Sequence, residues 1–140
     1  MASANVRQLK PRQTDSEKIT INLGFVDLGH IDLLVKDGFY SNRTDLIRTA
    51  IRNQLDRHGD VVRGTVARKG IDLGLRHYAK ADLEAALAAG TMIDINVLGL
   101  ASIGSDVSPE LALAAINSVS VLGALHASLK VRTALKDRIR

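Results

Sequence analysis

The chain has 140 residues, enough for one or two small domains, and 46% of them are apolar. Aromatic residues make up only 3%, so any core must be mainly aliphatic. No cysteine is present, which excludes disulfides, thiolate catalysis and cysteine-based metal sites. The formal charge of +4 is compatible with a nucleic-acid partner but does not establish one.

The first segment is polar. Residues 1–17 carry Arg7, Lys10 and Arg12 and show no apolar period, so they predict a flexible basic arm. Such an arm either touches DNA phosphates or is an uninvolved terminus. The segment lacks the apolar run of a secretory signal, and no later stretch approaches the roughly 18 apolar residues of a membrane helix. We therefore expect a cytoplasmic protein without a membrane partner.

A short alternating stretch, KITINL, occupies residues 18–23 and predicts a strand. Its apolar side chains share one face and its polar side chains share the other. The apolar face holds Ile19, Ile21 and Leu23, and the polar face holds Lys18, Thr20 and Asn22. A strand of this length cannot fold alone, so it needs a partner strand.

Two helices are predicted after the strand. The first runs from about Leu28 to Lys36, with Asp27 as its cap and Gly38 as its stop. The second begins at Ser41 as N-cap and ends at His58. A strand–helix–helix unit of about 40 residues buries too little surface as a monomer. We therefore expect an intertwined dimer in which two strands pair antiparallel and four helices cover their apolar face.

From Ile71 onward the sequence repeats with an offset of 24 residues, over segments 71–94, 95–118 and 119–140. In this alignment Leu73, Val97 and Val121 correspond, and Gly99 recurs as Gly123, which suggests close packing or a bend. Each segment opens with an apolar strand-like run and continues into an Ala/Leu-rich helix. Such units stack into a small parallel sheet or a solenoid. The alternative is an irregular α/β domain whose segments look alike because of composition.

The predicted fold class is therefore α+β. Residues 18–58 form the dimeric unit, 59–70 a linker, and 71–140 a small α/β repeat domain for oligomerisation or regulation.

Residues 18–57 resemble the ribbon-helix-helix family of bacterial and archaeal DNA-binding proteins, of the Arc, MetJ and CopG type. The matching stretches are KITINL, VKDGFYSNR and SNRTDLIRTAIRNQL. Gly24 departs from the family, because many members carry proline after the strand, and Gly29 within the first helix is a second departure. The C-terminal half is not matched to a known family.

The resemblance implies a DNA-binding surface. The polar strand residues Lys18, Thr20 and Asn22 would read bases in the major groove of double-stranded DNA. The backbone N–H groups of Asn42 and Arg43, helped by Ser41, would bind a phosphate at the start of the second helix, and the Arg43 side chain would add a charge. The alternatives are a solvated polar strand face and a Ser41 that only caps the helix.

No residues point to catalysis, a metal or a cofactor. The histidines are widely separated and show no paired metal-ligand spacing. They are His30, His58, His77 and His126. The acidic residues of the second half are scattered, and its glycines form no phosphate-binding loop. We therefore expect neither an enzyme nor a metal site.

The expected function is that of a sequence-specific transcriptional regulator, most simply a repressor, acting as a homodimer or as a larger oligomer such as a tetramer. One alternative is a self-assembling structural or architectural DNA-organising protein, because stacked repeats expose end strands that can pair with another copy. A second alternative is the antitoxin of a toxin–antitoxin pair. It ranks lower, since the C-terminal half is too apolar and regular for a disordered toxin-binding tail.

Overall fold

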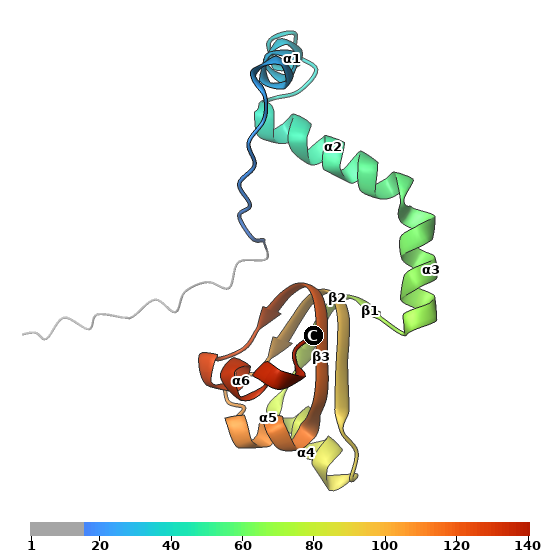
Figure 1. Ribbon diagram of the computed structural model, residues 1–140, viewed down its shortest axis with the longest axis vertical. Coiled ribbons are helices and arrows are strands. Elements are labelled where there is room, and N and C mark those ends of the chain that lie inside the picture. Colours follow the sequence, from blue (N-terminus) through green and yellow to red (C-terminus); the bar gives the residue numbers. More distant parts are fainter. Residues whose placement is uncertain (1–15) are drawn as a thin grey trace, which may run out of the picture. The chain divides into compact units, whose positions relative to one another are not determined.

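A computed structural model describes residues 16–140 (Figure 1). The chain divides into two compact units, Met1–Asn53 and Gln54–Arg140. The predicted basic arm, residues 1–17, lies almost wholly outside the described residues and stays a prediction.

The segment that precedes the first helix has no regular secondary structure within one chain. Residues 17–24 are exposed, and Ile19 and Ile21 remain 72% and 56% accessible. Among the described residues, no strand pairs with this segment. The ribbon expected at residues 18–23 requires a second chain, so the ribbon and the intertwined dimer stay predictions.

Helix α1 spans Phe25–Lys36 and begins three residues before the predicted start. The expectation that Asp27 caps this helix is wrong. Gly24 occupies the N-cap position in an extended conformation, and Asp27 lies in the first turn, where a negative charge favours the helix. The predicted stop at Gly38 is confirmed. Its φ is +83°, and Phe39 and Gly38 donate to the carbonyls of Leu34 and Val35 in a Schellman motif.

Helix α2 spans Arg43–Arg57, and helix α3 follows almost at once over Gly59–Lys69. The stretch expected as a linker, residues 59–70, is thus mainly helical. Its charges suit a helix, because Asp60 lies in the first turn and Arg68 and Lys69 lie in the last. Gly70 ends α3 in the left-handed conformation, with φ of 59°.

The C-terminal unit contains a three-stranded parallel sheet in the order β1-β2-β3. The strands are β1 Asp72–Tyr78, β2 Ile93–Ile103 and β3 Ile116–His126. The helices are α4 Lys80–Ala88, α5 Pro109–Ala115 and α6 Leu129–Ala134, followed by the 3₁₀ helix η1 Lys136–Arg138. Helices α4 and α5 each return the chain to the start of the next strand, and α6 and η1 follow the last strand (Figure 1). The predicted parallel sheet is confirmed.

Strand register corrects the alignment of the first segment. Val97 pairs with Val121 at the expected offset of 24 residues, but Leu73 pairs with Leu98 rather than with Val97. A shift of one residue moves a side chain to the opposite face of a sheet. Leu73 and Leu75 therefore point away from the core and remain 65% and 78% exposed.

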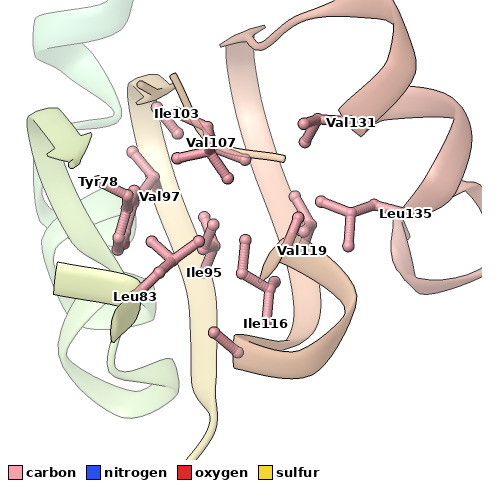
Figure 2. Close-up of a cluster of buried hydrophobic side chains, with 13 residues drawn as sticks. Tyr78, Leu83, Ile95, Val97, Ile103, Val107, Ile116, Val119, Val131 and Leu135 are labelled. Carbon is pink, nitrogen blue, oxygen red and sulfur yellow. The ribbon is translucent and has the colours of Figure 1, made fainter. Parts of the chain in front are cut away.

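The core lies between the sheet and helices α4, α5 and α6. Figure 2 shows the cluster, in which side chains from the strands meet Leu83 of α4, Val131 of α6 and Leu135. It is aliphatic, as the composition requires, apart from the buried Tyr78. Its members are Tyr78, Leu83, Ile95, Val97, Ala101, Ile103, Val107, Ala112, Ala115, Ile116, Val119, Val131 and Leu135.

Three glycines form a row across the sheet. Gly74 pairs with Gly99, and Gly99 pairs with Gly123. Their φ values of 111°, 136° and 125° lie in a region that other residues rarely adopt. A Cβ on Gly99 would overlap the carbonyl oxygen of Gly74, and a Cβ on Gly123 would overlap that of Gly99. The close packing suggested by the recurrence of Gly99 and Gly123 is confirmed.

The glycine row gives a graded mutational test. Gly74→Ala introduces only backbone strain of about 1–3 kcal/mol, because nothing lies within 4 Å of the added Cβ. Gly99→Ala adds an overlap with the Gly74 backbone, so its loss of unfolding free energy should be clearly larger. Urea unfolding followed by circular dichroism measures both variants. Equal losses of unfolding free energy in the two variants would show that the overlap with the Gly74 backbone does not destabilise the fold.

Candidate nucleic-acid interface

The residues expected to read bases are accessible. Lys18, Thr20 and Asn22 lie in the exposed segment that precedes α1. Within the described part of the chain, their side chains take part in no hydrogen bond or salt bridge. They are close together only because they are close in sequence, since one chain alone does not place them on a common strand face.

The start of α2 is held by a reciprocal pair of hydrogen bonds. The Asn42 side chain accepts from the backbone N–H of Asp45 at 2.8 Å, and the Asp45 carboxylate accepts from the backbone N–H of Ser41 at 3.0 Å. The first bond is that of an N-cap side chain to the third residue of the helix, and the second holds the residue before the cap. The expectation that Ser41 is the N-cap is wrong, because Asn42 precedes α2 and its side chain accepts from Asp45.

Free backbone donors remain at this helix start. In residues 16–140 the backbone N–H groups of Asn42, Arg43 and Thr44 have no protein acceptor, as is usual for the first turn of a helix. Two of them, Asn42 and Arg43, are the groups expected to bind a phosphate. Together with the helix dipole they make this end of α2 chemically suited to an anion.

The Arg43 side chain is engaged within the chain. Its Nε and Nη2 donate to the two carboxylate oxygens of Asp32 in α1, at 2.7 and 2.8 Å. Both side chains are about half-exposed. The hydrogen bond from Arg43 lowers the pKa of Asp32, and the bond to Asp32 raises the pKa of Arg43. The guanidinium thus joins the start of α2 to α1, and its backbone N–H is the part that remains free.

The sequence does not mark Asp32 as a partner of Arg43. It lies eleven residues before Arg43, across the turn between the two helices. No local spacing rule pairs residues at that separation, because helical neighbours are three or four residues apart. Only the turn around Gly38 brings the two side chains together.

The described histidines form only isolated polar contacts. His77 Nδ1 lies 2.7 Å from the Ser102 hydroxyl, and His58 lies near Gln54. Within residues 16–140, no group of three or more His, Asp or Glu side chains gathers in a way that could hold a metal ion. Over the same residues, none of the helices combines the length and apolar character needed to cross a membrane.

The Asp32–Arg43 pair has a specific pH signature. A lowered carboxyl pKa contributes stability above the pKa of the unfolded chain, and this contribution is lost as the pH falls through the folded pKa. Arg43→Gln should return the pKa of Asp32 towards its ordinary value in an NMR titration. Arg48→Gln removes the same charge from α2 and should leave the Asp32 titration where it was. A titration unaffected by Arg43→Gln would contradict the pairing.

A family model described as the Ribbon-Helix-Helix transcriptional regulator family matches residues 14–132. The match covers the candidate strand, α1 to α5, the whole parallel sheet and part of α6. It extends far beyond residues 18–57, so both units belong to the matched pattern. No curated protein and no solved structure matches the chain.

Proposed function

The chain belongs to the ribbon-helix-helix transcriptional regulator family, and from this premise we propose that it is a sequence-specific DNA-binding repressor. It would act as a homodimer or a higher oligomer in the cytoplasm, without a cofactor and without enzymatic activity. The observation that carries the proposal is the exposed segment 18–23, whose apolar and polar residues alternate and which pairs with no strand among residues 16–140.

A second chain is needed to complete the N-terminal unit. Helices α1 and α2 contain no buried residue, and their apolar side chains are left in solvent. The large exposed ones are Phe25, Val26, Leu33, Leu34, Ile51 and Leu55. Apolar surface of this extent is costly in water. Pairing of two segments through residues 18–23 would supply a sheet whose apolar face, Ile19, Ile21 and Leu23, the helices can cover.

The same pairing would present the polar face to DNA. Lys18 can donate to guanine O6 or N7, and Asn22 can form two hydrogen bonds with adenine. Thr20 can contact a thymine methyl, and its hydroxyl can donate or accept a hydrogen bond. The free N–H groups of Asn42 and Arg43 would bind a phosphate beside the groove. Ser41 would contribute its hydroxyl, since its backbone N–H is bound to Asp45. The Asp32–Arg43 ion pair would fix the start of α2 against α1.

Base reading is tested by matched substitutions. Lys18→Ala and Asn22→Ala should each weaken binding to the specific site by about 1–3 kcal/mol, the usual value of a good base contact. Lys80→Ala and Asn53→Ala remove the same side chains from exposed positions outside the proposed surface and should have little effect. A footprint on the promoter of its own gene would identify the site, and fluorescence anisotropy would give the affinities. Unchanged specific affinity in the first pair would rule out the base-reading assignment.

A second candidate, an architectural protein that organises DNA by self-assembly, is favoured by one observation. Within the described residues, the outer edge of β1 has no strand partner, whereas the edge of β3 is partly occupied by a bridge between Val119 and Ile139. An open edge can pair with another chain. Light scattering over a concentration series separates the candidates. Growth without limit favours assembly, and a fixed dimer or tetramer favours the repressor.

A further inference from the structure

The parallel sheet is covered on one face only. Helices α4, α5 and α6 and the core residues of Figure 2 lie on the face that contains Ile95, Val97 and Val119. The side chains between these positions along the strands point to the other face. There Leu122 is 63% exposed, similar to Leu73 and Leu75 of β1.

The middle of the uncovered face carries two apolar rows that cross the three strands in register, with polar residues at both ends. One row is Leu73, Leu98 and Leu122, and the next is Leu75, Leu100 and Ala124. No charged residue interrupts them. Parallel sheets in proteins are almost always buried on both faces, and contiguous exposed apolar patches mark interaction surfaces. We refer to these six residues as the leucine face.

We propose that the leucine face packs against the leucine face of a second copy of this chain, with the strands of the two sheets running in opposite directions. This inference goes beyond the proposed function and does not depend on it. The ribbon and the leucine face would join the same two copies, and the sheet contact alone should hold the dimer. A two-fold axis brings the same patch together from both copies, as is usual in homo-oligomers.

The polar rows at the ends of the leucine face favour the antiparallel orientation. At the carboxyl end of the strands, His77, Ser102 and His126 lie in register. At the amino end, Asp94 accepts hydrogen bonds from Asn117 and Ser118. Antiparallel packing places each histidine row opposite the acidic end of the other copy, whereas parallel packing would place the histidine rows opposite each other. An imidazole N–H can donate a hydrogen bond to a carboxylate, so hydrogen bonding across the rim favours the first arrangement.

Sedimentation of full-length variants tests the pairing. Ile21→Glu removes an apolar residue from the proposed ribbon, and Leu75→Glu with Leu122→Glu charges the leucine face. The Ile21→Glu chain should remain dimeric through its sheets, and its mass should halve when both leucine substitutions are added. Leu87→Glu with Leu129→Glu places the same charges on exposed leucines of α4 and α6 and should leave the Ile21→Glu chain dimeric. A monomeric Ile21→Glu chain with an intact circular dichroism spectrum would overturn the proposal.

The leucine substitutions in an otherwise unchanged chain separate this inference from the proposed function. If that variant falls to a monomer, the ribbon does not hold the chains together, and the sheet pairing stands by itself. If its oligomeric mass is unchanged and the Ile21→Glu chain is also monomeric, the sheet pairing fails and the ribbon stands.

Thiol labelling gives an independent readout because the chain has no cysteine. A cysteine in place of Leu73 should react slowly with a maleimide in the otherwise unchanged chain, and rapidly once Leu75→Glu and Leu122→Glu are added. Leu129→Cys, on α6, should react rapidly in both backgrounds. Rapid reaction of Leu73→Cys in the otherwise unchanged chain would contradict coverage of the face. Slow reaction that persists in the charged variant would assign the cover to another element of the same chain and would equally overturn the proposal.

Discussion

Burial of apolar surface is the constraint on which the rest of this molecule depends, and the two units meet it differently. The C-terminal unit builds its own core of thirteen buried residues between a sheet and three helices. The N-terminal unit has no buried residue among those described, although its helices are rich in leucine and isoleucine. One unit therefore buries its apolar side chains within a single chain, and the other leaves them exposed among the described residues. The second copy proposed above would cover them. This division is consistent with a family model that spans both units.

Local polar interactions hold the two helices of the N-terminal unit at their facing ends. The Schellman motif at Gly38 fixes the turn after α1, and the hydrogen bonds made by the Asn42 and Asp45 side chains fix the start of α2. The Asp32–Arg43 ion pair then ties one helix to the other. These contacts are polar and exposed, so each adds little stability, but together they restrict how α1 and α2 are oriented relative to each other.

The sequence predicted the positions of the helices and of the sheet better than it predicted strand register and helix capping. Periodicity located α1, α2 and a parallel sheet, because repeated apolar spacing determines which segments can be buried together. It aligned Leu73 with Val97, whereas Leu73 pairs with Leu98, so the first strand is shifted by one residue relative to the 24-residue repeat. Ser41 and Asn42 are both good cap residues, and composition alone could not choose between them. The pairing of Arg43 with Asp32 depends on the turn between α1 and α2, and no helical spacing rule predicts it.

The glycine row also makes the two edges of the sheet different. At Gly99 and Gly123 the space of a side chain is filled by the carbonyl of the preceding strand, whereas the same space at Gly74 is empty. Gly74 nevertheless adopts the same backbone conformation as the other two, with no neighbour that requires it. The first strand thus has the shape of an interior strand although it lies at the edge. An additional parallel strand could therefore pair with β1 without a change in the conformation of β1. Any side chain at position 74 would occupy the space that the carbonyl of this strand needs.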